Sequence, residues 1–293
     1  MSVRRPLLWA LRVIWFVLGP VLAGTVGEAF EAFSRPVGVV AVILVWVGWA
    51  VGLLAVLVPS PLGLTAIRVA APAGLGAAAL SALSNDADPL ALALASIAAV
   101  VALSAPLGDD FVDASSYGPE RRLPLRVPGP LLLGPIPLAW LALVAGTTVG
   151  PLLLAGRAWV AGVIVTAVGL PLAAVAARAL HQLSRRWIVY VPGGVVIHDH
   201  MAVLDPVLCR RNVLQAMTGA LADTEATDLT LGALGSAVEI LLSQPVDYVP
   251  AAGRRRTVEL ERSRAFLVTP TRPGRALELA DEHRVPTRRP DGA

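Results

Sequence analysis

The fold is decided by residues 158–191, which read AWVAGVIVTAVGLPLAAVAARALHQLSRRWIVYV. The first part, 158–181, is long and apolar enough to cross the roughly 30 Å hydrocarbon core of a bilayer as a helix. Arg185 and Arg186 then end the apolar run, and Trp187–Val191 has the β-branched and aromatic character of a strand. The stretch therefore marks the boundary between a membrane region and a soluble region.

Apolar stretches of about 20 residues recur throughout the chain before this boundary. They predict six transmembrane helices, at about 7–26, 37–58, 62–83, 89–107, 130–154 and 158–181. Residues 1–183 hold only 10 of the 24 Arg and 8 of the 21 acidic residues, whereas the last 110 residues have the charge density of a soluble domain. We therefore expect a transmembrane domain at 1–183, a cytosolic module at 185–285 and a disordered tail at 286–293.

Arginine is concentrated on one side of the six predicted spans. Seven Arg precede span one, lie between spans four and five, or follow span six: Arg4, Arg5, Arg121, Arg122, Arg126, Arg185 and Arg186. The opposite loops hold two, Arg35 and Arg157. The positive-inside rule then places both termini in the cytoplasm of a bacterial inner membrane. The first span also has features of a cleavable signal peptide, although Arg12 interrupts its apolar core.

All 24 basic residues are Arg, and Cys209 is the only cysteine. Exclusive use of Arg, together with abundant Ala, Gly, Pro and Val, is typical of GC-rich coding sequences. The whole chain resembles multi-span membrane proteins of high-GC Gram-positive (actinobacterial) bacteria, a resemblance that implies no activity. A single cysteine excludes an internal disulfide, and a net charge of +3 gives no reason to expect a nucleic-acid partner.

The C-terminal region has the pattern of a β-rich module. Trp187–Val191, a Pro-Gly-Gly turn and Val195–Ile197 predict a hairpin. Alternating apolar residues at 236–242 predict a half-buried strand, and residues 273–283 predict a terminal helix. Strands followed by one terminal helix resemble the bacterial pleckstrin-homology-like module. That resemblance implies a bent β-barrel, plugged by the helix, over about residues 185–285.

The segment His198-Asp199-His200 is the first candidate site. On a strand, the two histidines would face the same side and could bind a metal ion. The alternative is a polar strand end entering a turn, because structural zinc needs four protein ligands and catalytic zinc three. We keep His198 and His200 as candidate metal ligands and expect no cofactor.

The segment Asp109-Asp110-Phe-Val-Asp113 is the second candidate site. It resembles the Asp-Asp-x-x-Asp motif of membrane prenyltransferases, in which aspartates chelate Mg²⁺ and, through it, a diphosphate. We find no second acidic motif of this kind in the sequence. Gly108 predicts that the three aspartates lie on a loop, so the alternative is a solvated segment beside the membrane.

A basic turn is the third candidate. Arg254, Arg255 and Arg256, with Arg262 and Arg264 nearby, would attract the headgroups of an anionic leaflet, at about 1 kcal/mol for each Arg close to the surface. The alternative is a soluble loop whose charge is balanced by neighbouring glutamates. We therefore treat the three consecutive arginines as candidate lipid-headgroup ligands.

Taken together, these patterns predict a non-enzymatic integral membrane protein. Its helices would anchor a cytosolic β-rich module that binds either an anionic inner-leaflet lipid or a cytosolic or membrane protein. The alternative is an enzyme or carrier for an anionic lipid or an isoprenoid phosphate at the cytoplasmic face. That alternative requires the three aspartates of the second candidate to converge around a cavity with Arg12, Arg68 or Arg178, which lie within the spans. The non-enzymatic prediction requires these residues to be scattered in solvent.

Overall fold

The computed structural model describes residues 5–84, 88–251 and 259–288, and the chain divides into two compact units. The first unit comprises residues 1–114 and 135–184, and the second comprises residues 115–134 and 185–293. The second unit therefore draws on two parts of the chain that are separated by residues 135–184.

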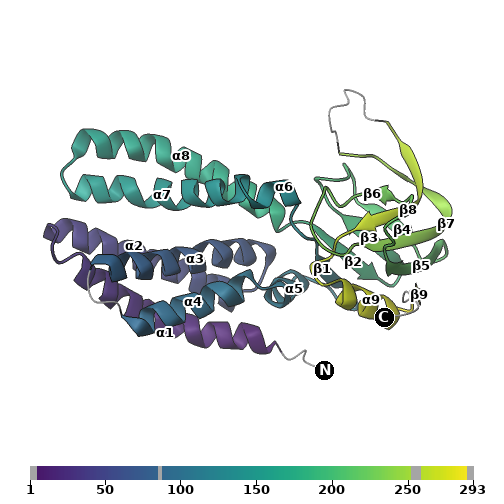
Figure 1. Ribbon diagram of the computed structural model, residues 1–293, viewed down its shortest axis with the longest axis horizontal. Helices are drawn as coiled ribbons and strands as arrows, with labels where there is room; N and C mark the ends of the chain where they lie inside the picture. The colour runs from purple at the N-terminus through teal and green to yellow at the C-terminus, as the bar shows by residue number, and fades with distance from the viewer. Residues whose placement is uncertain (1–4, 85–87, 252–258, 289–293) are drawn as a thin grey trace. The chain divides into compact units, whose positions relative to one another are not determined.

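The first unit is helical through most of its described residues (Figure 1). Its helices are α1 (Pro6–Ala29), α2 (Arg35–Leu57), α3 (Pro61–Ser84), α4 (Pro89–Leu103), α5 (Ala105–Asp113), α7 (Pro135–Ala155) and α8 (Trp159–Leu183). Among the described residues, five helical segments are long and apolar enough to cross a membrane. A sixth is obtained if α4 and α5, which are bent by 62°, form one span. The predicted helical N-terminal region with long apolar helices is confirmed, and the six predicted spans correspond to five or six such segments among the described residues.

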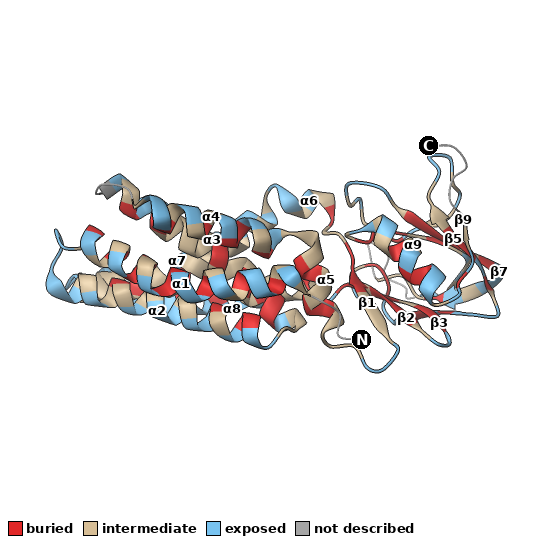
Figure 2. Ribbon diagram, turned by 90° about the horizontal axis from the view of Figure 1, so that it is seen from below, coloured by how far each residue is buried: buried red, intermediate tan, exposed pale blue. Residues whose placement is uncertain are grey.

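These helices expose many residues (Figure 2), and large apolar side chains are among the exposed ones. Leu83, Val100 and Val160 are each more than 70% exposed, at 84%, 71% and 76%. Soluble proteins rarely expose contiguous apolar surface on this scale, so these faces are suited to lipid.

Glycines allow close helix packing in this unit. A Cβ atom on Gly146 of α7 would collide with the backbone of Gly169 of α8, and one on Gly150 would collide with Thr166. Small residues at a helix interface let two backbones approach each other, which is the usual basis of packing in membranes. The α7–α8 pair is therefore held together by backbone proximity.

Among its described residues, the second unit contains two β-sheets and two short helices. Its elements are β1 (Arg121–Pro124), α6 (Gly129–Leu132), β2 (Trp187–Val191), β3 (Gly194–His198), β4 (Val207–Arg210), β5 (Leu214–Gly219), β6 (Thr227–Asp228), β7 (Val238–Tyr248), β8 (Glu261–Val268), α9 (Pro273–Glu282) and β9 (Thr287–Arg288). The first sheet has the order β1-β2-β3-β4, and the second has the order β6-β8-β7-β5-β9. The predicted hairpin (β2–β3), strand (β7) and terminal helix (α9) are all present.

Strand β1 comes from the segment between α5 and α7, which the sequence assigned to the transmembrane domain. It pairs antiparallel with β2, with Arg122 opposite Val189 and Leu123 opposite Ile188. The expected domain boundary is therefore corrected: residues 115–134 belong to the β-rich unit, because β1 completes the edge of β2 and Leu123 enters the core. The segments directly before α7 and directly after α8 are therefore joined in one sheet.

The described strands do not close into the barrel that the pleckstrin-homology-like resemblance implied. Strands β4 and β5 are consecutive in sequence but do not pair, because the chain crosses from the first sheet to the second at residues 211–213. There, the Arg211 amide donates to the Gly193 carbonyl and the Val213 amide donates to the Arg210 carbonyl. The result is two separate sheets rather than one continuous one.

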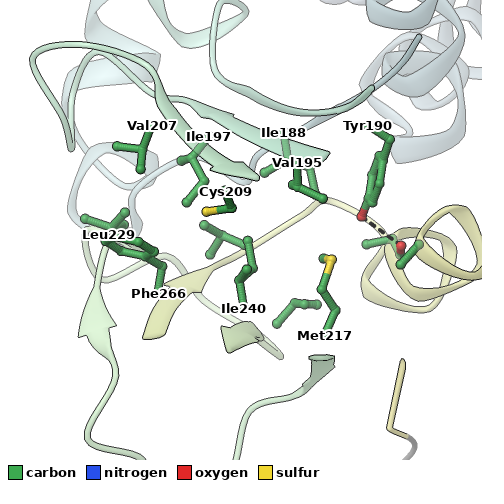
Figure 3. Packing of buried hydrophobic residues seen from close by; sticks show 14 of the residues in the cluster. Ile188, Tyr190, Val195, Ile197, Val207, Cys209, Met217, Leu229, Ile240 and Phe266 are labelled. Atoms are coloured by element: carbon green, nitrogen blue, oxygen red, sulfur yellow. Dashed lines mark hydrogen bonds between the residues drawn. The ribbon is translucent and has the colours of Figure 1, made fainter. Parts of the chain in front are cut away.

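The core of the second unit lies between the two sheets and α9. Side chains of the first sheet, such as Ile188 and Ile197, point towards those of the second, such as Ile240 and Phe266 (Figure 3). The Tyr190 hydroxyl donates to the Ala276 carbonyl of α9 at 2.7 Å, which ties the helix to the first sheet.

The expected disordered tail, 286–293, is partly ordered. The Met217 amide donates to the Pro286 carbonyl, and Thr287–Arg288 pair in parallel with β5. Residues 286–288 therefore extend the second sheet, while residues 289–293 lie outside the described part of the chain.

Candidate functional site

The chain enters the β-rich unit at Arg185 and Arg186, directly after α8 ends at Leu183. These two arginines have opposite environments: Arg185 is exposed, whereas the Arg186 side chain is 1% exposed. The alternation continues into β2, where Ile188 lies in the core and Trp187 is only partly buried. Arg186 therefore belongs to the fold of the unit, and Arg185 to its surface.

Arg186 forms a buried, two-pronged ion pair with Asp199. Its Nε donates to Asp199 Oδ1 at 2.7 Å and its Nη2 to Asp199 Oδ2 at 2.6 Å. Its Nη1 donates to the Arg126 carbonyl at 2.9 Å, and the Met201 amide also donates to Asp199 Oδ1, at 3.1 Å. Both carboxylate oxygens of Asp199, the central residue of the His198-Asp199-His200 segment, therefore accept hydrogen bonds. Together with the Arg186 bond to Arg126, they connect β2, the turn after β3 and the segment after β1.

The two histidines on either side of Asp199 face outward. His198 is the last residue of β3 and lies opposite Trp187 of β2; the two rings stack, with centroids 4.9 Å apart and planes 21° apart. His200 is exposed in the following turn. The strand therefore ends at His198, two residues earlier than a metal-binding pair on one strand would require.

Arginines complete a basic surface around these rings. The Arg122 guanidinium carbon lies 5.5 Å from the Trp187 ring centroid, a cation–π arrangement made possible by the β1–β2 pairing. We call Arg122, Arg185, Trp187, His198 and His200 the basic aromatic cluster.

Burial and neighbouring charges both act on the two histidines. Partial burial lowers the pKa of His198, and the positive charges of Arg185, His200 and Arg122 lower it further, against a smaller opposing effect of Asp199. Burial likewise lowers the pKa of His200, with Asp199 opposing and Arg185 contributing. The positive charges around His198 would also repel a divalent cation placed beside it.

Acidic partners balance part of this charge. Arg122 Nε pairs with Glu120 Oε1 at 2.7 Å, and Arg186 is neutralised by Asp199. The net sign of the cluster is therefore set mainly by Arg185 and by the protonation of the two histidines. In the described part of the chain, no three His, Cys, Asp or Glu side chains are grouped so that they could hold a metal ion.

The aspartates of the second candidate lie on a helix, not on the loop predicted from Gly108. Helix α5 forms because Leu107, Phe111 and Val112 give it one fully buried apolar face against its neighbours. Asp109 and Asp113, four residues apart, lie one above the other on this helix. Burial of the helix's apolar face thus outweighs the low helix propensity of Gly108.

Two of these aspartates interact with arginines. Asp110 Oδ1 lies 3.9 Å from Arg5 Nε, and Asp109 interacts electrostatically with Arg68. Carboxylates paired with guanidinium groups are poorly prepared to chelate Mg²⁺, because the metal would first have to displace the arginines.

The arginines inside the spans act on helix ends. Arg12 Nε donates to the Val56 carbonyl in the last turn of α2 at 2.9 Å, and Arg68 Nε donates to the Ala102 carbonyl in the last turn of α4 at 3.3 Å. A cation at a helix C-terminus satisfies carbonyls that lack intrahelical partners. Arg178 is exposed on α8. Of these three, Arg68 is the one that acts on the acidic segment.

Arg254, Arg255 and Arg256 lie outside the described residues, so their role stays a prediction. Strands β7 and β8 precede and follow these three residues in the chain. The two strands pair with each other, with Tyr248 opposite Glu261 at one end of the hairpin and Val238 opposite Val268 at the other.

Comparisons of the chain with protein-family models, with curated proteins and with solved structures gave no match. The basic aromatic cluster therefore has to be interpreted from its own chemistry. Sequence reasoning identified His198 and His200 but missed Arg122 and its contact with Trp187. These two residues are separated in sequence by both helices α7 and α8, and no local pattern predicts that β1 pairs with β2.

Proposed function

We propose that this protein anchors its β-rich unit at the cytoplasmic face of a bacterial inner membrane, where the basic aromatic cluster binds the headgroups of anionic inner-leaflet lipids. It performs no reaction in this role. The observation that carries the proposal is the position of the cluster in the chain: Arg185 and Trp187 follow the end of a membrane-spanning helix, α8, within four residues.

This chain distance restricts where the cluster can lie. Arg185 is two positions after Leu183, so the Cα of Arg185 is at most about 7 Å from the end of the span. The attraction of a basic residue to an anionic leaflet extends over about 8–10 Å at physiological ionic strength. Arg185 therefore remains within the field of the leaflet in whatever way the unit is oriented.

The composition of the cluster suits the headgroup region. Tryptophan is enriched at membrane interfaces, where the ring is buried and its polar edge stays hydrated. Arginine binds phosphate oxygens through several parallel donors, and histidines add positive charge as the surface pH falls. The combination of these residue types supports recognition of a phosphodiester rather than of a neutral lipid.

The proposed side of the membrane follows from the Arg distribution. Residues 115–134 and 185–288 share one side because β1 pairs with β2, and both segments carry arginines of the positive loops. Arg122 and Arg185 are among them, so residues of the basic aromatic cluster also contribute to the orientation that the positive-inside rule predicts.

The resemblance to a pleckstrin-homology-like module is retained only as the order of strands and terminal helix, since the described strands form two sheets. The alternative of an enzyme or carrier for an isoprenoid phosphate is supported only in part, because Asp109 interacts with Arg68 as that alternative requires, whereas Asp110 lies beside Arg5 instead.

The test uses the full-length protein in neutral detergent, titrated with a short-chain phosphatidylglycerol or with the matching phosphatidylcholine. We expect tighter binding of phosphatidylglycerol, weakened by salt. Arg185→Gln should lower that affinity about fivefold, and Arg122→Gln/Arg185→Gln about thirtyfold at most, from about 1 kcal/mol per arginine. Arg210→Gln is the matched control, since Arg210 is exposed on the same sheet but pairs with Gly194, at the opposite end of β3 from His198.

A triple variant, Arg254→Gln/Arg255→Gln/Arg256→Gln, separates the two candidate basic sites. If this variant loses phosphatidylglycerol binding and the Arg122/Arg185 variant keeps it, the headgroup site is the turn at 254–256 and not the cluster. If neither variant changes binding, the proposal fails and the unit is better interpreted as a protein-docking surface.

A further inference from the structure

Three exposed leucines lie on the second unit next to the point where its chain enters α7. Leu132 and Leu133, at the end of α6, are 41% and 95% exposed, and Leu234 is 69% exposed. Leu234 lies against the first residue of α6, because a Cβ atom on Gly129 would be 3.4 Å from Leu234 Cγ. One helical turn, about 5 Å, separates Gly129 from Leu132 and Leu133. We call these three side chains the leucine wedge.

The loop that carries Leu234 is held by α6 and by the segment before it. The Gly129 amide donates to the Gly232 carbonyl at 3.1 Å, and Pro128 forms a β-bridge with Ala233. Leu231 and Gly232 both adopt left-handed backbone conformations, with φ of 55° and 69°. A leucine is held in this conformation only where the surrounding contacts compensate for it.

Arg126 fixes the exposed end of the same loop. Its Nη1 donates to the Leu234 carbonyl at 2.7 Å, and its guanidinium occupies the space that a side chain on Gly235 would need. Gly235 has a φ of 104°, a conformation that favours glycine. Arg126 in turn accepts, through its carbonyl, the hydrogen bond of the buried Arg186. The loop is therefore built to display Leu234 in a fixed position.

The position of Leu132 and Leu133 next to α7 in the chain indicates what covers this apolar surface. Leu132 and Leu133 lie near the start of the apolar segment Gly129–Ala155, which is long enough to cross a membrane and contains α7 from Pro135 onward. The Cα of Leu133 is at most about 7 Å from the first residue of α7. At that position the surroundings are the boundary between lipid headgroups and acyl chains.

We infer that the leucine wedge enters the lipid bilayer at this boundary and seats the β-rich unit on the membrane surface. Exposed leucines beside polar backbone are suited to this layer, into which amphipathic segments insert about 5–10 Å. The contact requires only that α7 spans the membrane. It does not depend on headgroup charge, so it stands or falls separately from the lipid recognition proposed above.

The inference is tested by spin labelling of the full-length protein in phosphatidylcholine bilayers. Leu133→Cys and Leu234→Cys carry the label, and Leu260→Cys is the matched control. Leu260 is 64% exposed, close to the value for Leu234, but it adjoins Glu261 at the opposite end of the β7–β8 hairpin from Val238. That end is about 23 Å away along seven residues of strand.

Collisions with oxygen, which concentrates in the acyl region, and with a water-soluble nickel chelate report the depth of each label. We expect labels at 133 and 234 to be reached at least threefold more by oxygen than by the chelate, relative to the label at 260. Chelate access at 234 equal to that at 260 would overturn the inference. Protection of 234 from both reagents would also overturn it, because the wedge would then be covered by protein.

Leu234→Asn provides a second measurement that does not depend on the label. In the wild type, we expect the loop 230–235 to be protected from protease in bilayers and cleaved in lipid-free detergent. The Asn variant should be cleaved in both. Equal cleavage of wild type and variant in bilayers would contradict insertion.

Discussion

Arg186 and Asp199 meet through two parallel hydrogen bonds of 2.7 and 2.6 Å, with each side chain no more than 1% exposed. The pair joins the second residue of the β-rich unit's longer segment to the turn after β3. Through the Arg126 carbonyl it also reaches the shorter segment. Both chain segments that connect this unit to the helices are thus fixed by one guanidinium group.

Removing one partner of this pair should unfold the β-rich unit. Asp199→Ala leaves Arg186 buried without its counter-ion, which costs about 3–5 kcal/mol. We expect a clear loss of thermal stability and rapid proteolysis of residues 185–288, while the helical unit stays intact. Asp205→Ala, at an exposed position in the same turn region, is the control. Unchanged proteolysis in the Asp199 variant would show that the ion pair contributes little.

Stability of the β-rich unit should fall as the solution is acidified. The folded pKa values of His198 and His200 are lowered, while in the unfolded chain both titrate near 6.5. The unfolded state therefore binds more protons below about pH 6.5, so the contribution of both histidines is fully present above that pH and is lost as pH falls towards the folded pKa values. Unfolding followed from pH 8 to 5 in neutral detergent measures this.

The double variant His198→Gln/His200→Gln isolates the two histidines in that titration. Its unfolding temperature should depend on pH less steeply than that of the wild type over the same range. A slope identical to that of the wild type would assign the acid sensitivity to other groups.

The thiol of Cys209 should be unreactive in the folded protein. Burial raises its pKa to about 12, and the side chain is fully buried in the core between the sheets (Figure 3). Because the thiolate is the reactive form, a maleimide at pH 7 should label the protein only after denaturation. Rapid labelling of the native protein would show that the two sheets open readily.

Two tryptophans hold α1 and α2 together in a reciprocal way. Trp15 Nε1 donates to the Trp49 carbonyl at 2.9 Å, and Trp49 Nε1 donates to the Trp15 carbonyl at 2.8 Å. A Cβ atom on Gly52 would collide with the Trp15 indole, whereas one on Gly48 would meet nothing within 4 Å. Gly52→Ala should therefore destabilise the helical unit by about 1–3 kcal/mol, and Gly48→Ala should not. Equal melting temperatures for the two variants in detergent would contradict this packing.

The sequence predicted the helices well because a bilayer imposes a strict length and polarity on each span. Spans near 7–26 and 37–58 correspond to α1 and α2, and the hairpin at 187–197 follows from strand character on both sides of a Pro-Gly-Gly turn. Local chemistry alone determines such elements.

Contacts between distant segments were not predictable in this way. No pattern near Arg122 indicates that β1 pairs with β2, and nothing in the segment His198-Asp199-His200 indicates that Asp199 forms a buried ion pair with Arg186. The aspartates after Gly108 were expected on a loop because a helix there depends on tertiary burial of Phe111. The missing information in each case is which distant surface a segment packs against.

The central claim, a β-rich unit at the inner leaflet, is tested most directly by labelling single cysteines with an impermeant maleimide in intact cells. Ser34→Cys, between α1 and α2, and Ala158→Cys, between α7 and α8, should react. Tyr117→Cys, 82% exposed on the β-rich unit, should react only after the membrane is opened. The buried Cys209 can remain in place as an unreactive background. Labelling of Tyr117→Cys in intact cells, with Ala158→Cys protected, would place the unit outside and contradict the account.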